Sequence, residues 1–326
     1  MPFRDQNPAA LATVDPLERF FAIEAAFEQG RGLLGDRTSL RLASAQLVRI
    51  PGEPDELVAA VRNTDAVLSK LSGFNLTVAG PLWMLVAGVL IEHGDVAEGF
   101  VAELGQIRGW MREVGMRRYA AYEIIAALAL RLGSRPHAVG RDQVARVQAI
   151  YDAMKRHHWW LTGPEDLPAC AVLGMTERSP AELAGSANAI YEGLRRHARA
   201  WPGDLLQTAS NILAVSPLQP TELVERYTTL VAAFERRGVS ISFPNYGDVA
   251  ALCFLAQPAE RIAETVQGYT GPLYSRLSWA DGGLAFTLAA HLAFTRLLGD
   301  DPLLGILASA KALFDMQKVI EAQSSG

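Results

Sequence analysis

Apolar residues recur along the chain at the three- and four-residue spacing of α-helices, and glycine and proline separate the resulting segments. The sustained alternation of apolar and polar residues that is typical of strands is nearly absent. The pattern therefore predicts an all-α fold. Three helices are expected first, over Asp15–Gln29, Ser39–Val48 and Glu53–Ser72. We expect residues 1–72 to pack on the array of helices that follows.

Residues 73–322 are predicted to form about six helical hairpins in one domain, and residues 323–326 a disordered tail. In each hairpin a short, very apolar helix precedes a longer amphipathic helix. The expected pairs are Gly80–His93 with Asp95–Glu113, Tyr119–Leu132 with Arg141–His157, Glu165–Met175 with Ala181–Ala198, Asp204–Val215 with Thr221–Arg237, Asp248–Ala256 with Ala259–Tyr269, and Asp281–Leu298 with Leu303–Ala322.

Two sequence features indicate that the hairpins are copies of one unit. The short helices begin near a carboxylate followed by small and apolar residues, at Glu123, Asp166, Asp204, Asp248 and Asp281. These carboxylates are 33 to 44 positions apart, which is the range of two-helix repeats. Several long helices begin with a polar residue, proline, any residue and glutamate, as at Ser179–Glu182, Gln219–Glu222 and Gln257–Glu260. Proline is tolerated at the first helical position, and the glutamate can accept hydrogen bonds from free amides.

A helix that is apolar on nearly all sides must be covered on all sides. We therefore expect the short helices to form an inner layer and the long helices an outer layer facing water. A curved, open solenoid satisfies this requirement, and so does a closed α/α toroid with a central cavity. The number of hairpins and the apolarity of the short helices favour the toroid.

In a closed array, the first residues of all the short helices would surround one opening. Aromatic residues in the preceding loops would join the carboxylates there, and a mouth of this kind is typical of a small-molecule site. The expected catalytic residues are Asp166, Asp204 and Glu165, because clustered carboxylates raise one another's pKa into the useful range. The expected substrate-binding residues are His158, Trp159, Trp160, Glu123, Trp201, Tyr246, Asp248, Trp279 and Asp281.

Each of these residues also has a simpler structural interpretation. Acidic residues in the first turn of a helix are favoured by the helix dipole, whatever the protein does. His157 and His158 end a predicted long helix, where a cation is also favourable, and Trp159 and Trp160 can pack between hairpins. Cys170 and Cys253 each lie in an apolar run and are expected to be small core side chains.

Charge and motifs exclude several classes of function. The net charge of −5, without a cluster of basic and aromatic residues, argues against nucleic-acid binding. The apolar runs are too short to cross a bilayer, and the first residues do not resemble a signal peptide, so we expect a cytoplasmic protein with no membrane contact. Motifs for metals, nucleotides or activated nucleophiles are absent, so no cofactor and no metal are predicted.

The run His157–Leu173, with the sequence HHWWLTGPEDLPACAVL, resembles a segment of an uncharacterised bacterial family, the domain-of-unknown-function family four-thousand-and-three. Leu71–Gly80 is similar to the stretch that precedes the first apolar helix of that family. The resemblance implies a shared importance of Leu161, Thr162, Glu165 and Asp166, but it implies no activity, because the family carries no assigned activity.

Two functions follow as hypotheses. The first is a small-molecule-binding protein that takes an apolar or cationic ligand, with a lyase, cyclase or hydrolase activity as its catalytic form. Cation–π contacts from the tryptophans would suit a cation. The second is a helical scaffold that binds a protein partner without chemistry. Oligomerisation is compatible with both.

Overall fold

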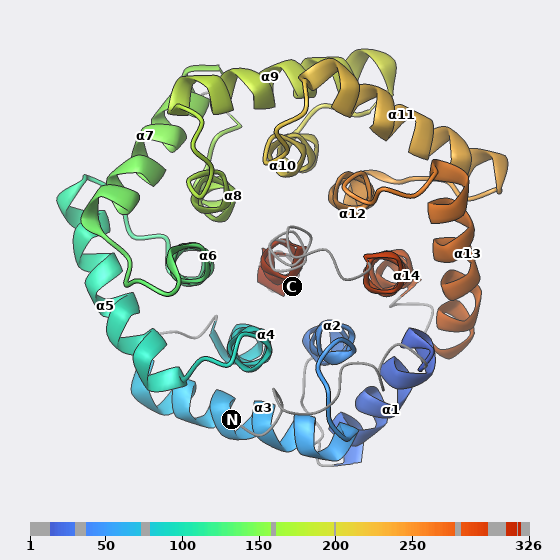
Figure 1. The fold of residues 1–326 in the computed structure, drawn as a ribbon, viewed down its shortest axis with the longest axis horizontal. Helices are drawn as coiled ribbons and strands as arrows, with labels where there is room; N and C mark the ends of the chain where they lie inside the picture. Colours follow the sequence, from blue (N-terminus) through green and yellow to red (C-terminus); the bar gives the residue numbers. More distant parts are fainter. Residues whose placement is uncertain are drawn as a thin grey trace. The chain divides into compact units, whose positions relative to one another are not determined.

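A computed structural model of the chain contains α-helices, two short 3-10 helices and the loops that join them (Figure 1). The structure describes residues 14–29, 37–72, 79–157, 161–198, 200–277, 282–298, 311–317 and 319–320. No strand occurs within these ranges. The predicted all-α fold is therefore confirmed.

The chain divides into two compact units, which are described separately. One unit comprises residues 1–104 and 315–326, and the other comprises residues 105–314. The division falls within α5 (Ala97–Glu113), between Leu104 and Gly105. The domain boundary suggested by the sequence at residues 72–73 stays a prediction.

The first unit is built on four helices that surround an apolar core. They are α1 (Pro16–Gln29), α2 (Arg37–Leu47), α3 (Pro54–Ser72) and α4 (Ala79–Glu92). Helix α1 packs on α2 and α3, and α4 packs on the same two helices. Phe20, Phe27 and Trp83 are among its largest fully buried side chains, so aromatic packing fixes this core.

The second unit alternates short and long helices. The short helices are α6 (Ala121–Ser134), α8 (Leu167–Leu173), α10 (Asp204–Leu213), α12 (Tyr246–Leu252) and α14 (Gly282–Leu297), with the 3-10 turns η2 (Pro164–Asp166) and η3 (Phe243–Asn245) before α8 and α12. The long helices are α7 (Arg141–His157), α9 (Pro180–His197), α11 (Pro220–Arg236) and α13 (Ala259–Arg276). For the helices listed here the bounds agree with the predictions within a few residues, except that α13 extends to Arg276 instead of Tyr269. Most of the predicted helix Leu303–Ala322 and all of the predicted tail at residues 323–326 lie outside the described residues.

Within this second unit the two kinds of helix form two layers (Figure 1). Each short helix contacts the next short helix, from α6 through α8, α10 and α12 to α14. The long helices α7, α9, α11 and α13 also contact one another in order. All seven residues of α8, Cys170 included, are buried, and Cys253 at the end of α12 is buried as well. Whether the whole array closes into a toroid stays a prediction.

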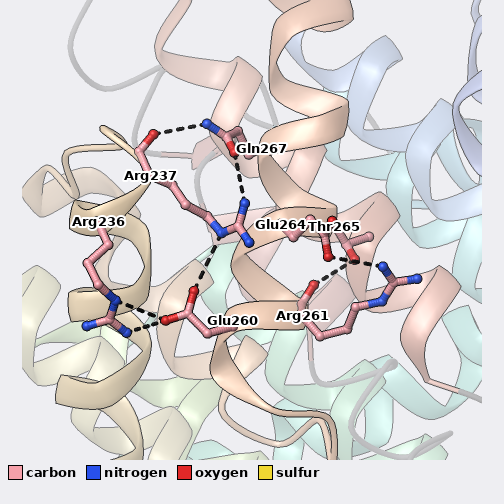
Figure 2. Close-up of polar contacts among 7 residues, drawn as sticks. All are labelled: Arg236, Arg237, Glu260, Arg261, Glu264, Thr265 and Gln267. Atoms are coloured by element: carbon pink, nitrogen blue, oxygen red, sulfur yellow. Dashed lines mark hydrogen bonds and ion pairs between the residues drawn. The ribbon is translucent and has the colours of Figure 1, made fainter.

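The predicted caps of the long helices are realised at α9 and replaced at α13. Ser179 Oγ accepts from the Glu182 N–H at 3.3 Å, and the Glu182 carboxylate accepts from the Ser179 N–H at 2.8 Å. At α13 the cap position is Pro258, which has no N–H to offer. Glu260 instead accepts a hydrogen bond from Arg236 Nε at 3.0 Å and pairs with Arg237 Nε at 3.7 Å (Figure 2).

Four arginine side chains donate hydrogen bonds to main-chain carbonyl oxygens at or just after the ends of the short helices α2, α8, α10 and α12. The last carbonyl groups of a helix have no partner inside the helix, and a guanidinium can satisfy several of them at once. The contacts run from Arg19 to the carbonyl oxygens of Val48, Ile50 and Gly52, from Arg146 to those of Gly174, Thr176 and Arg178, from Arg178 to those of Ala214 and Ser216, and from Arg226 to that of Leu255.

Candidate functional site

The segment Gly163–Asp166 places a carboxylate at the start of α8. Pro164 occupies the first position of the 3-10 turn, where its missing N–H leaves no hydrogen bond unmade. The turn then leads into the fully buried helix α8, so Asp166 is carried into the interior and is only 2% exposed. The Gly163 N–H donates to Asp166 Oδ2 at 3.1 Å, which fixes the side chain across the turn.

Two side-chain amides of α10 complete the surroundings of this carboxylate. Gln207 Nε2 donates to Asp166 Oδ2 at 2.8 Å, and Asn211 Nδ2 donates to Asp166 Oδ1 at 2.9 Å. The two amides are four residues apart, so they lie on the same face of α10 and reach the two carboxylate oxygens together. Among the residues that the structure describes, no cation forms an ion pair with Asp166.

Burial changes the proton affinity of Asp166. Burial raises the pKa of Asp166 to about 7, against the opposing effect of the hydrogen bonds from Gln207 and Gly163. The negative charges of Glu165 and Asp204 act in the same direction as burial. The half-buried Glu165 has a raised pKa as well, first because of burial and then because of Asp204. These three predicted catalytic residues are therefore within electrostatic reach of one another.

A small cavity with both polar and apolar walls lies beside this network, between α7, α9 and α10. Its volume is about 10 Å³, which is enough for one water-sized group. The residues that line it are Met154, His157, Thr162, Ala184, Ala187, Asn188, Tyr191, Gln207, Ser210 and Asn211. Gln207 and Asn211 thus donate to Asp166 and also line the cavity. The carboxylate therefore fixes the orientation of two side chains in the cavity wall.

Glu123, a predicted ligand-binding residue, belongs to a different cluster. Its carboxylate accepts from Arg108 Nε at 3.0 Å, from Arg112 Nη2 and from the Tyr119 N–H at 2.9 Å. The Glu123 side chain is 4% exposed, so two arginines of α5 neutralise a buried charge at the start of α6. These contacts describe a structural anchor of α6.

Asp248 forms a third cluster. It is 1% exposed, accepts from Thr287 Oγ1 at 2.8 Å and pairs with Lys311 Nζ at 3.2 Å. Lys311 is 3% exposed, so both charges of the pair are buried. The pair connects the helical residues 311–314 with α12, and Thr287 adds a contact from α14.

The remaining predicted residues lie in or next to the loop before α10, at the start of α12, or outside the described residues. Asp204 is exposed at the start of α10, and Trp201 is 76% exposed. The Trp201 N–H donates to the hydroxyl of the buried Tyr246 at 3.1 Å, which joins this loop to α12. His158, Trp159, Trp160, Trp279 and Asp281 lie outside the described residues.

Glu165 and Asp204 are therefore close enough to Asp166 to influence its ionisation, whereas Glu123 and Asp248 have separate partners. The amides Gln207 and Asn211, which the sequence reading did not single out, form the core of the candidate site. Their signal in the sequence is weak: they are the two amide residues of α10 and lie four positions apart, but Asp204, Thr208 and Ser210 of the same helix are polar as well. Within the described ranges, no group of three or more His, Cys, Asp or Glu residues has a geometry that could hold a metal ion.

The fold and this site define an all-helical protein whose short, buried helices begin at acidic residues. Residues 60–323 match the family described as "Protein of unknown function (DUF4003)". The chain belongs to this family, and the resemblance identified at His157–Leu173 is confirmed.

The chain is also similar to the "Uncharacterized protein YeaA" of Bacillus subtilis (strain 168), with 26% identity over 149 residues. The match covers 45% of this chain and 44% of that protein, so it spans less than half of the curated relative. No solved structure matches the chain. None of the helices in the described ranges is long and apolar enough to cross a bilayer.

Proposed function

We propose that the protein binds a small polar molecule at the cavity between α7, α9 and α10. The observation that supports this proposal most directly is the buried carboxylate of Asp166, which two neutral amides hold and which no described cation neutralises. A buried carboxylate costs stability unless it is fully paired, and such groups concentrate at functional sites. Because the same amides line the cavity, the carboxylate is a positioning group for a ligand there.

If the protein is an enzyme, we propose that these carboxyl groups transfer a proton to or from the bound molecule. Glu165 and Asp204 lie near Asp166, and burial raises the pKa of Glu165 and brings that of Asp166 to about 7, close to the range in which an acid or base works best. A lyase, cyclase or hydrolase that moves one proton would use a carboxyl group of this kind. We expect Asp204→Asn and Glu165→Gln to lower the turnover of such a reaction while the protein stays folded.

The proposal is tested by the small molecules that leave the purified protein when it is denatured. Mass spectrometry should find one compound in near-stoichiometric amount with the wild type, and much less with Asp166→Asn. Asp65→Asn is the matched control, because it makes the same chemical change at a partly buried carboxyl group in the other unit. Equal retention of the compound by all three proteins would contradict the proposal.

A protein-binding scaffold is the second candidate, and a surface groove supports it. The groove has a volume of about 370 Å³ between α11 and the start of α13. Leu230 and Ile262 contribute to its apolar part, and the exposed Glu222 and Glu225 contribute to its charged part. Thr229→Trp would fill this groove from an exposed position. It should reduce the size of any complex measured by size-exclusion chromatography in cell extract, whereas Gln148→Trp on α7 should not.

A further inference from the structure

The cavity beside Asp166 offers hydrogen-bond acceptors to whatever occupies it. Gln207 is 4% exposed, and both hydrogens of its Nε2 are committed, to Asp166 Oδ2 at 2.8 Å and to Thr162 Oγ1 at 3.4 Å. Its Oε1 is buried and has no hydrogen-bond partner. Above about pH 7 Asp166 is ionised and accepts hydrogen bonds only, so the amide cannot then be turned over, because the carboxylate requires the nitrogen on its side.

Ser210 strengthens this pattern. Its hydroxyl donates to the Leu206 carbonyl oxygen at 2.8 Å, one turn earlier in α10. The lone pairs of Ser210 Oγ are then what this side chain can offer to the cavity that it lines. A bound group that donates hydrogen bonds would satisfy Gln207 Oε1, and a group that only accepts them would leave it unpaired.

The charges around the cavity favour a positive occupant. Asp166 lies directly behind the two amides, and Glu165 and Asp204 are close enough to affect its ionisation. No lysine or arginine is among the described residues that line the cavity. A cation in the cavity would be attracted by these carboxylates, and no lysine or arginine among the described lining residues would repel it.

The size of the cavity limits the group that enters it. A volume of about 10 Å³ holds one non-hydrogen atom with its hydrogens. Exposed His157 is among the lining residues, so the cavity reaches the surface at the end of α7. We infer that the cavity binds the terminal ammonium group of a primary amine, whose remaining atoms extend past His157. This inference rests on the proposed function and names the class of its ligand.

The test uses n-propylamine, with n-propanol as a neutral probe of similar size, on the full-length protein in isothermal titration calorimetry. We expect the protonated amine to bind at least tenfold more tightly than the alcohol. Gln207→Leu should weaken amine binding at least tenfold, because it removes the unpaired oxygen. Gln148→Leu makes the same change on α7, where the amide contacts Asp152 instead of the cavity, and should leave binding unchanged.

Ala187→Leu separates ligand binding from the integrity of the Asp166 network. Ala187 lines the cavity and is 5% exposed, so the larger side chain would fill the space without removing any hydrogen bond of Gln207. We expect this variant to lose amine binding even if Gln207→Leu proves too unstable to measure. Amine binding that survives in the folded Ala187→Leu protein would overturn the inference.

Two further outcomes also overturn it, and each has a different meaning for the proposed function. Equal affinity for propylamine and propanol, lost in Ala187→Leu, would show a polar cavity without preference for ammonium and would leave the proposed function standing. No binding of either probe would indicate a site occupied by water alone. In that case the proposed function fails only if the copurified compound is also retained by Asp166→Asn.

Discussion

Replacement of Asp166 by asparagine should change how the stability of the protein depends on pH. An ordinary aspartate has a pKa of 3.8, whereas Asp166 in the folded protein has a pKa of about 7 because it is buried. Between these values the folded state holds a proton that the unfolded state has lost, so raising the pH favours unfolding. The stability contributed by protonated Asp166 is therefore complete below about pH 4, declines as the pH rises, and is gone above about pH 7.

The size of this effect follows from the difference between the two pKa values. A tenfold change in proton affinity is worth about 1.4 kcal/mol, so Asp166 contributes a pH-dependent stability on the order of 4 kcal/mol. For a unit of about 200 residues, roughly 2 °C of melting temperature corresponds to each kcal/mol. The wild type should therefore lose on the order of 8 °C between pH 4 and pH 8 relative to Asp166→Asn. Asparagine carries no proton in this range, and Gln207 can rotate its unpaired Oε1 toward the new amide.

Differential scanning calorimetry of both proteins from pH 4 to pH 8 measures this difference directly. Effects of the substitution that do not depend on pH shift the melting temperature of Asp166→Asn by the same amount at every pH. They therefore do not change how the difference in melting temperature from the wild type varies with pH. Asp65→Asn serves as the control, because burial raises the pKa of Asp65 to about 6. The stability that protonated Asp65 contributes should therefore already be lost when the pH rises above about 6, before that of Asp166 is lost. Parallel curves for the wild type and Asp166→Asn would refute the assignment of a raised pKa to Asp166.

Three further predictions concern contacts that hold the fold. Lys311→Met should cost about 3–5 kcal/mol in urea unfolding, because it leaves Asp248 buried without its cation, and adding Asp248→Asn should recover much of the loss. No recovery in the double variant would contradict this. Arg146→Met should cost about 2 kcal/mol by the same assay, because it strips donors from the carbonyl groups of Gly174 and Thr176, whereas Arg141→Met at an exposed ion pair should cost less than 1 kcal/mol. Ser179→Ala should cost about 1 kcal/mol through loss of the α9 cap, and an unchanged midpoint would indicate that Glu182 caps the helix alone.

Local sequence was sufficient to predict the helices because their ends carry strong signals. Asp15-Pro16, Glu53-Pro54 and Ser179-Pro180 mark helix starts that the structure places at Pro16, Pro54 and Pro180. Proline and a preceding polar residue act within one turn, so the surrounding chain does not alter them. The end of α13 was predicted seven residues too early at Tyr269, because Gly271-Pro272 looks like a stop signal but lies inside the helix.

The candidate site was only partly predictable, because the partner of each carboxylate is set by tertiary packing. The acidic starts of the short helices look equivalent in the sequence, yet Glu123 meets two arginines, Asp166 meets two amides and Asp248 meets a lysine. Lys311 is far from Asp248 in the chain, and nothing in the local sequence of either residue indicates the pair. Periodicity and motif spacing therefore could not predict which carboxylate forms no ion pair with the described part of the chain.

The arginine contacts have a consequence for how this chain can change over evolutionary time. Arg146, Arg178 and Arg226 each donate hydrogen bonds to main-chain carbonyl oxygens, and every amino acid has a main-chain carbonyl oxygen. These contacts therefore do not depend on which side chains the residues at the contacted positions carry, provided that length and register are kept. At the positions that supply these carbonyl groups, substitutions should therefore be tolerated where a one-residue insertion, which moves the carbonyl groups away from the guanidinium, is not.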